Sequence, residues 1–498
     1  MDTLERDALE VLRLTRSLKN SLTPINRIPP EVLSLLPDYC DELDMDEDSI
    51  SLTHVCRAWR NTFISRSLLW THLDFTNTDK TRTYLQRSKS SPLKICLGAD
   101  NEDETVLEDV VPFVISHIYR LKSLVVRGYA LPDVLRYFCH HAPLLEELDV
   151  SIVGRRDPVL DSAPFNGDLS SIRKLTLGGV ITYFPWKNMA NLRVASLGGR
   201  DAGHAISRLL NFESAPLLHT VRLEDSLPDS SDAPPERIVS LPHLRVLTID
   251  AGPVHSILLN HLHIPAVTSL TQIFEYGQGI PPLLDNLPQA PADLGNLAHI
   301  TTINLCFDST QKLLLLHGPS GSLRAVANLA RHKPIPRYDL DPQLFRYLSS
   351  PILSTTRGLT VLEYKYFDPA GADRCPAVSQ ALSSMGNLRT LVLVRCNPLP
   401  FVFVLDPRQD SSEPAACPNL WNLTLYIEAW NQFPTKQLIT MAKNRASRGA
   451  GLSSITIVCP QEFVPGEEMI RLKEYVTHVE YRVGDNLPTW DALPDESK

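Results

Sequence analysis

The chain has 498 residues, and its 57 acidic and 48 basic side chains give a formal net charge of −9. A hydrophobic content of 43% excludes wholesale disorder, and 76 leucines, about 15% of the chain, exceed ordinary usage. No apolar stretch approaches the roughly 20 residues that span a bilayer, so we expect no membrane protein. The acidic balance likewise argues against binding to nucleic acid, which requires a basic surface.

The nine cysteines form no C-x-x-C pair, which argues against a disulfide framework or a zinc ribbon. We therefore expect a reducing compartment, cytoplasmic or nuclear, and a chain without cofactor or metal. No Ser-His-Asp or Cys-His constellation is recognisable, so the sequence predicts no catalytic residue and no enzymatic activity.

Residues 1–22 mix acidic and basic side chains among their leucines, unlike the uninterrupted apolar core of a secretory signal. They are predicted to form either an amphipathic helix or a flexible segment. A helix here would fold onto the module that follows or pair with another chain, and the sequence leaves these two alternatives open.

Residues 23–75 are predicted to form a separate helical module. Pro29, Pro30 and Glu31 are typical of a helix start. From Ile50 to Ile64, apolar residues recur on one face with a helical period, which predicts a single helix. Three short helices over about 50 residues are marginally stable alone, and they leave apolar surface for a partner to cover.

An acidic run interrupts this module, since seven of the eleven residues 38–48 are Asp or Glu. The spacing Asp44-x-Asp46-x-Asp48 is that of the opening of a calcium-binding loop. Ser49 and Val55, however, stand where that loop needs Gly and Glu. A solvated acidic loop is therefore the predicted structure.

Three sequence blocks in this module carry a family resemblance: Ile28-Pro29-Pro30-Glu31-Val32-Leu33, Val55-Cys56-Arg57-Ala58-Trp59-Arg60 and Leu69-Trp70-Thr71-His72-Leu73. In this order they resemble an F-box, whose pattern is Leu-Pro-x-Glu-aliphatic-Leu, Val-Cys-Arg-x-Trp-Arg and Leu-Trp-x-x-Leu. The departures are Ile28 in place of Leu and the acidic insertion, which leaves open whether an adaptor docks in the usual way.

The resemblance implies that the module binds a Skp-family adaptor, which bridges to a cullin ubiquitin ligase. For Trp59, and equally for Trp70, a place in the module's own core is an alternative, because buried aromatic residues dominate cores and interfaces alike. The residues that the resemblance assigns to adaptor binding are Ile28, Pro29, Val32, Leu33, Val55 and Trp59.

From about residue 120 onward, an apolar-x-x-apolar-x-apolar pattern recurs, mostly every 20 to 32 residues. Each copy predicts one buried strand, and the helical patterns and Pro or Gly turns between copies complete a leucine-rich-repeat unit. Two wider gaps are predicted to hide degenerate copies, at Val267/Leu270 and at Leu313–Leu316. The clear copies are Leu121/Leu124/Val126, Leu145/Leu148/Val150, Ile172/Leu175/Leu177, Leu218/Val221/Leu223, Leu244/Leu247/Ile249, Ile300/Ile303/Leu305, Leu359/Leu362/Tyr364, Leu388/Leu391/Leu393, Leu420/Leu423/Leu425 and Leu452/Ile455/Ile457, with a weaker one at Leu192/Ala195/Leu197.

The predicted fold is α/β: an irregular leucine-rich-repeat solenoid over residues 76–482, with parallel strands on the concave face and helices outside. Cys396 fits the place where this repeat family bonds a side chain to the backbone. Residues 483–498 are expected to form a tail. Helices are predicted over 110–120, 131–141, 205–212, 342–349, 378–384 and 435–448.

Residues between the core positions of each strand point away from the core, onto the concave face. They mix charges and hydroxyl groups without a dominant sign, which suits a protein ligand better than a polyanion. The candidate substrate-binding residues are Arg127, Glu147, Asp149, Lys174, Arg222, Glu224, Asp250, Asn304, Glu363 and Tyr426.

F-box proteins often carry leucine-rich repeats as substrate-binding domains. The resemblance therefore implies a substrate-recognition subunit of a cullin-type ubiquitin ligase. The alternative is a repeat scaffold or inhibitor that binds its partner without ubiquitin transfer. The sequence identifies neither the target protein nor any requirement for phosphorylation or a small molecule.

Overall fold

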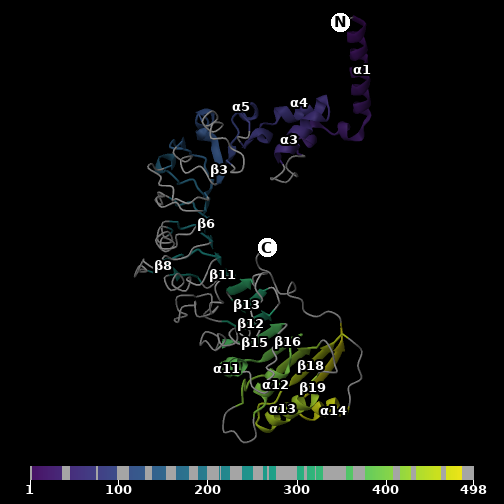
Figure 1. The fold of residues 1–498 in the computed structure, drawn as a ribbon, viewed down its shortest axis with the longest axis vertical. Helices are drawn as coiled ribbons and strands as arrows, with labels where there is room; N and C mark the ends of the chain where they lie inside the picture. The colour runs from purple at the N-terminus through teal and green to yellow at the C-terminus, as the bar shows by residue number, and fades with distance from the viewer. Residues whose placement is uncertain are drawn as a thin grey trace. The chain divides into compact units, whose positions relative to one another are not determined.

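In the computed structural model, the chain divides into two compact units, Met1–Ala195 and Ser196–Lys498, and each is described by itself (Figure 1). The division falls within strand β6 (Val194–Gly198). The structure describes residues 3–35, 45–74, 77–97, 112–128, 137–152, 164–178, 189–198, 212, 215–224, 238–250, 262–265, 268–275, 300–307, 311–319, 321–328, 355–362, 376–407, 415–427, 433–460 and 467–484.

The first unit begins with helices before it enters a sheet. Pro30 opens its second α-helix, where the missing N–H of proline costs nothing because that N–H would have no partner in the helix. The elements are α1 (Thr3–Leu22), η1 (Pro24–Arg27), α2 (Pro30–Leu33), α3 (Met45–His54), α4 (Arg57–Ser65), η3 (Ser67–Trp70) and, after the first strand, α5 (Thr78–Arg87).

Aromatic side chains form the core of these helices. Trp59 and Phe63 of α4 are buried, and their rings meet edge to face at 5.6 Å. Trp70 is fully buried, with its Nε1 donating to the Phe63 carbonyl at 3.1 Å and its ring 5.0 Å from that of Tyr84. Both tryptophans are therefore core residues.

The single helix predicted from Ile50 to Ile64 is wrong, because the chain forms two helices, α3 and α4, with a break between them. At the break Cys56 is extended, with φ −156° and ψ 176°. The break lets Trp59 be 6% exposed while Val55, four residues earlier, is 53% exposed. One continuous helix would have placed both side chains on the same face.

The predicted acidic loop is shorter than expected, because α3 begins at Met45 and includes Asp46 and Asp48. Residues 36–44, the rest of the acidic run, lie outside the described residues.

The sheet of the first unit is parallel, with its strands side by side in chain order. Leu124 pairs in register with Leu148, and Leu148 pairs with Leu175; all three are buried. The apolar repeat positions predicted for these strands are confirmed as the core. The strands are β1 (His72–Leu73), β2 (Leu93–Leu97), β3 (Leu121–Gly128), β4 (Glu147–Ile152) and β5 (Lys174–Gly178), followed by β6.

The second unit also has a mostly parallel sheet, in which β13 alone among the paired strands of the described residues runs antiparallel to its neighbours. Side by side, the strands follow the order β7, β9, β11, β14, β13, β12, β15, β16, β17, β18, β19. Their bounds are β7 (Thr220–Glu224), β9 (Val246–Asp250), β11 (Ser269–Glu275), β12 (Thr302–Phe307), β13 (Gln311–His317), β14 (Ser322–Asn328), β15 (Gly358–Leu362), β16 (Thr390–Val394), β17 (Asn422–Tyr426), β18 (Ser454–Cys459) and β19 (His478–Val483), with a separate pair β8 (Val239–Ser240) and β10 (Leu262–His263).

The apolar run Leu313–Leu316 is a strand but not the degenerate repeat that the sequence predicted. It belongs to β13, which turns back on β12 and forms a hairpin with β14. The turn closes with the Gly318 N–H donating to the Gly321 carbonyl at 2.9 Å. Its four leucines are buried on both faces of the sheet, and this explains a continuous apolar run in place of alternation.

The repeat frame predicted at β15 is also wrong. Leu359 and Val361 are its buried strand residues, paired with Leu391 and Leu393 of β16. The first position of this repeat is therefore Thr356, which is fully buried. Because a threonine stands in place of the expected leucine, the apolar pattern indicates a frame three residues too late.

Helices pack in succession beside the last strands of the second unit (Figure 1). The helices predicted over 378–384 and 435–448 are confirmed as α11 (Pro376–Ser384) and α13 (Thr435–Ser447). The sequence missed α12 (Leu399–Leu405), whose uniformly apolar side chains show no helical period, and α14 (Glu467–Ile470) with η10 (Arg471–Glu474). In the helix predicted over 110–120, residues 112–115 are α-helical and η4 (Ile118–Arg120) follows after a turn, while residues 110–111 lie outside the described residues. The helices predicted over 131–141, 205–212 and 342–349 lie largely outside the described residues.

The described strands and helices together show a leucine-rich-repeat-like α/β architecture, with one core strand in most repeats. The backbone contact predicted for Cys396 is confirmed, because its Sγ donates to the Val361 carbonyl of the preceding repeat at 3.2 Å.

Candidate functional site

Five large apolar side chains in the described part of residues 23–55 remain at the surface although the helical module has a well-formed core. Each is between 41% and 53% exposed. We call them the exposed apolar set: Ile25, Val32, Leu35, Ile50 and Val55. They come from η1, α2 and α3 and from the residues that follow these helices, and both α2 and α3 pack on α4. These five side chains are candidate contacts for a protein partner.

The residues assigned to adaptor binding divide into two groups in the structure. Pro29, Val32 and Val55 are exposed and Ile28 is half-buried, so these four can touch a partner directly. Leu33 and Trp59 are buried in the module. Their contribution to any interface is to hold the exposed residues in place.

Asn26 is a positioning residue that sequence analysis missed. Its Oδ1 accepts a hydrogen bond from Trp59 Nε1 at 2.7 Å, and its Nδ2 donates to the Asn20 carbonyl near the end of α1 at 2.8 Å. One half-buried amide thus links α1, η1 and α4. The only signal in the sequence was indirect, because a buried tryptophan N–H needs an acceptor.

A second candidate surface is the strand face of the first unit that points away from the repeat core. Register places Lys94, Ser123, Glu147 and Lys174 in one row across β2, β3, β4 and β5. The Ser123 hydroxyl donates to Glu147 Oε2 at 3.3 Å. Ser123 is itself 5% exposed, so the row offers a ligand the charged side chains of Lys94, Glu147 and Lys174.

Asp149 organises the next part of this face. Its Oδ2 accepts from Arg127 Nη2 at 2.7 Å, and its Oδ1 accepts from the Ser151 hydroxyl at 3.1 Å. The hydrogen bond and the negative charge of Asp149 raise the pKa of the Arg127 guanidinium. Gly178 completes the arrangement, because a Cβ there would lie 2.8 Å from the Ser151 hydroxyl oxygen.

Of the predicted face residues in this unit, Arg127, Glu147 and Lys174 are exposed and Asp149 is half-buried. Arg127, Lys174 and Lys94 contribute three positive charges against the two negative charges of Glu147 and Asp149. The surface is therefore nearly neutral and strongly polar, as expected for binding a protein with charges of both signs.

The strand face of the second unit differs from the prediction at Asn304, which is 5% exposed and not available to a ligand. The reason is the β13 strand, which places Leu315 opposite Asn304 on the same face. Arg222 is exposed and Tyr426 half-buried. The side chains of Glu224 and Asp250, and all of Glu363, lie outside the described residues.

Part of this second face is apolar and buried. Cys306, Leu313, Leu315 and Val394 form one cluster, with Val392 and Tyr426 packed against it. Tyr426 is predicted to be a candidate ligand contact, whereas in the structure its side chain packs on hydrophobic neighbours. The polar ligand-binding character expected of the whole strand face is thus clearest in the first unit.

No group of three or more His, Cys, Asp or Glu side chains able to hold a metal ion occurs among the described residues. Within the same residues, no helix is both long enough and apolar enough to cross a membrane. Cys417 is buried, and this burial raises the pKa of its thiol to about 12, so it is protonated near neutral pH.

Comparisons with known proteins show no family. No family model matches the chain, and no curated protein matches it. One solved structure, the crystal structure of a TLR13–ssRNA13 complex, aligns at 14% sequence identity with a TM-score of 0.29. The alignment covers 74% of this chain and 46% of the chain in that crystal structure. The present chain therefore spans less than half of the length of that other chain. A likeness this weak carries no argument about function.

Proposed function

We propose that this protein is the substrate-recognition subunit of a cullin-type ubiquitin ligase. The helical module of residues 23–75 docks a Skp-family adaptor, and the polar strand face of the first unit holds a target protein. Two observations support the adaptor half of this proposal: the three motif blocks that resemble an F-box, and the exposed apolar set, of which Val32 and Val55 belong to the first two blocks.

The single observation that carries the proposal is the contrast between neighbouring residues of α2. The Leu33 side chain is buried in the core of the module, whereas the side chain of its neighbour Val32 is exposed to solvent. The motif thus supplies both a core residue and a surface residue, as a docking helix requires. Val55, which follows α3, is as exposed as Val32.

The chain performs no chemistry in this proposal. Its role is to raise the effective concentration of target lysines near the ubiquitin-charged enzyme, which its partners bring. A polar face organised by Asp149 suits this role because it can hold a protein reversibly. Charge pairs at the solvent-exposed edge of an interface affect the orientation and the association rate of the complex more than its affinity.

The test is capture of a Skp-family adaptor by the full chain and by two variants. Replacing Val32 and Val55 together by Glu puts two charges into the docking surface and should abolish capture while the helices remain folded. Leu144→Glu changes an equally exposed apolar residue of the repeats and should leave capture intact. A wild-type chain that captures no adaptor would overturn the proposal.

The rival function, a repeat scaffold without ubiquitin transfer, makes a different prediction for the same variants. Under the ligase proposal, the Val32/Val55 variant prolongs the half-life of proteins that bind the strand face. Under the rival, binding to the strand face persists and those half-lives are unchanged by the variant.

A further inference from the structure

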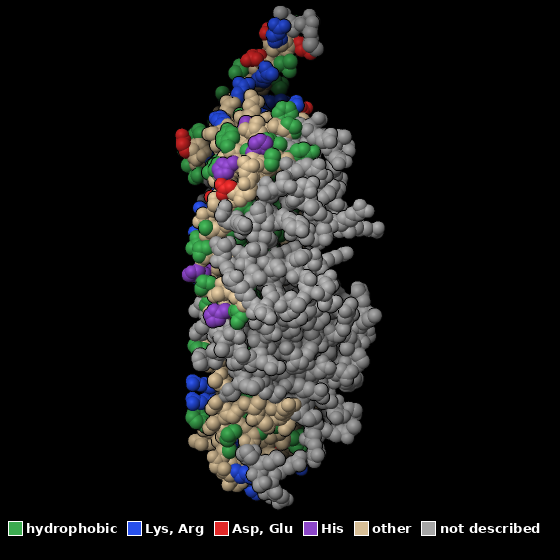
Figure 2. All heavy atoms as spheres, turned by 90° about the vertical axis from the view of Figure 1, so that its left-hand side faces the viewer, with side chains coloured by type: hydrophobic (Ala, Val, Ile, Leu, Met, Phe, Trp, Pro, Cys, Tyr) green, Lys and Arg blue, Asp and Glu red, His purple; other side chains and the backbone are tan. Residues whose placement is uncertain are grey.

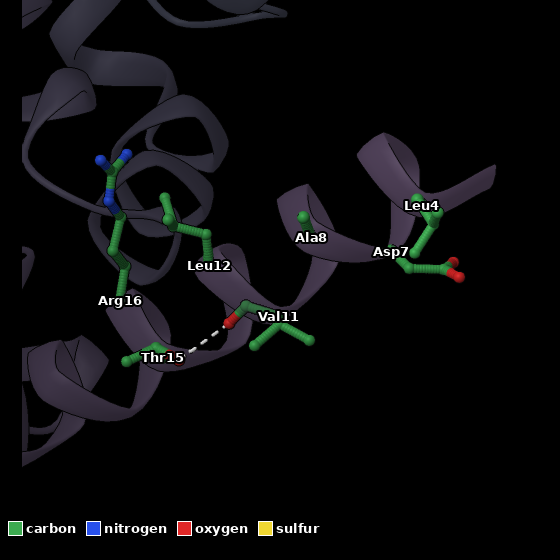
Figure 3. A pocket seen from close by; sticks show the side chains of 7 residues that line it. All are labelled: Leu4, Asp7, Ala8, Val11, Leu12, Thr15 and Arg16. Carbon is green, nitrogen blue, oxygen red and sulfur yellow. Dashed lines mark hydrogen bonds between the residues drawn. The ribbon is translucent and has the colours of Figure 1, made fainter. Parts of the chain in front are cut away.

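The helix α1 carries an apolar stripe that its own unit leaves in water. The helix has seven leucine and valine side chains, at residues 4, 9, 11, 12, 14, 18 and 22, which are between 48% and 80% exposed, and those at 4, 11, 18 and 22 belong to the stripe together with Ala8 and Thr15. Figure 3 shows side chains along this stretch, where Leu4, Ala8, Val11, Leu12 and Thr15 line a shallow groove together with two charged neighbours. Burying this stripe against another apolar surface would be favourable, so one face of α1 is suited to contact with a partner.

The stripe has the spacing of a coiled-coil seam. Residues 4, 8, 11, 15, 18 and 22 are alternately four and three positions apart, which keeps them on one side of a helix that pairs with another helix. Thr15 is the polar member of this seam. Its hydroxyl donates to the Val11 carbonyl at 2.8 Å, so its hydrogen-bonding need is met within α1 and its methyl group is free to pack (Figure 3).

Charge is divided along the length of α1. The amino half carries Glu5, Arg6, Asp7 and Glu10, a net charge of −2, and the carboxyl half carries Arg13, Arg16 and Lys19, a net charge of +3. Acidic, basic and hydrophobic side chains reach the surface together over α1, at the top of Figure 2. Two such helices side by side in parallel would oppose like charges, whereas antiparallel pairing places each acidic half against a basic half.

We propose that α1 pairs antiparallel with α1 of a second copy of this chain. Every seam position then meets another: Leu4 meets the partner's Leu22, Ala8 meets the partner's Leu18, and Val11 meets the partner's Thr15. On the flank of this seam, Glu5 lies beside the partner's Lys19, twice by symmetry. The contact is isologous and closes as a dimer.

The charges also argue for a protein partner and against a membrane. An interfacial membrane helix carries lysine and arginine over its polar face to meet anionic lipid. The amino half of α1 is instead acidic, so anionic lipid would repel half of the helix. A second α1 satisfies both halves at once.

Charge reversal on the full chain tests both the partner and the orientation, with sedimentation velocity as the measurement. Glu5→Lys alone, or Lys19→Glu alone, replaces two attractions by two repulsions and should weaken self-association about ten-fold. An equimolar mixture of the two single variants restores complementarity in both pairs and should form a mixed dimer. The double variant should dimerise as the wild type does.

The double variant also separates pairing from helix formation. Each substitution opposes the helix dipole, so loss of helix would be worst in the double variant. Recovery of the dimer there can arise only from the restored pair. Failure of both the double variant and the mixture to recover the dimer would overturn the proposed orientation.

A matched pair of leucines tests the seam itself. Leu18 lies in the seam and Leu9 lies on the opposite side of α1, and both are strongly exposed in the single chain. Leu18→Asp should shift the wild-type dimer to monomer, whereas Leu9→Asp should leave it unchanged. A wild-type chain that is monomeric at all concentrations, or a dimer indifferent to Leu18→Asp, contradicts the proposal.

Discussion

Arg445 holds a strained turn of the second unit in place, and its removal should be costly. Although it is a charged residue on α13, its side chain is fully buried. Its Nη1 donates to the Ala416 carbonyl at 2.8 Å and its Nη2 donates to the Cys417 carbonyl at 2.8 Å. Cys417 has a φ of 48°, in the left-handed region that residues with a Cβ rarely adopt.

The expected effect of Arg445→Met follows from these contacts. Hydrogen bonds from a charged group contribute about 1.5–3 kcal/mol each, so two short ones account for about 3–6 kcal/mol. Burial lowers the pKa of the Arg445 guanidinium, which shows that holding the cation inside is itself unfavourable. Arg445→Met also removes this unfavourable burial of a charge, which offsets part of the lost hydrogen-bond energy. The net destabilisation is therefore about 3 kcal/mol.

Amide hydrogen exchange is the appropriate assay, because a long repeat chain need not unfold in two states. A loss of about 3 kcal/mol in local stability should speed exchange across residues 415–427 about 100-fold. Lys443→Met, an exposed position of the same helix, is the matched control and should change exchange little. Equal exchange in the two variants would refute the argument that Arg445 maintains the turn.

Further predictions concern single residues in both units. Arg120, whose Nη1 donates to the Ser88 hydroxyl and to the Ser91 carbonyl, holds a second turn with a left-handed residue, and Arg120→Met should accelerate exchange over residues 85–91. Gln272 is buried at a core position, and its amide has no hydrogen-bond partner within the described part of the chain. Gln272→Leu should therefore raise the local stability by about 1–3 kcal/mol, measured as slower amide exchange in β11. Burial raises the pKa of the Cys417 thiol from 9.0 to about 12, so the unfolded chain loses this proton at lower pH than the folded chain does. The stability of the folded state should therefore fall as pH rises from about 9 to about 12. The Cys417→Ala variant should not show this fall. Asn26→Ala removes the acceptor of the Trp59 N–H and should destabilise the helical module by about 1–3 kcal/mol, measured as faster proteolysis within residues 23–75.

Much of the repeat core could be predicted because it depends on spacing alone. Leu148, Leu175 and Leu391 are buried where the apolar pattern placed them. The pattern failed where another residue type took a core position, as Thr356 does before β15. It failed again at Leu313–Leu316, because a run buried on both faces carries no information about strand direction.

The candidate site was less predictable for a related reason. A motif names residues without saying which of them face water, so it could not separate exposed Val32 from buried Leu33. Likewise, alternation along β12 placed Asn304 outward, and only the neighbouring hairpin shows why it is buried. Asn26 had no motif to indicate it, since its role depends on a contact 33 residues away.

The helical module as a docking surface is the central claim, and direct titration tests it most simply. A purified Skp-family adaptor titrated into the full wild-type chain should show saturable one-to-one binding by calorimetry. The same titration into the chain with both Val32 and Val55 replaced by Glu should show none. Absence of binding to the wild-type chain, or equal binding to both proteins, would contradict the account.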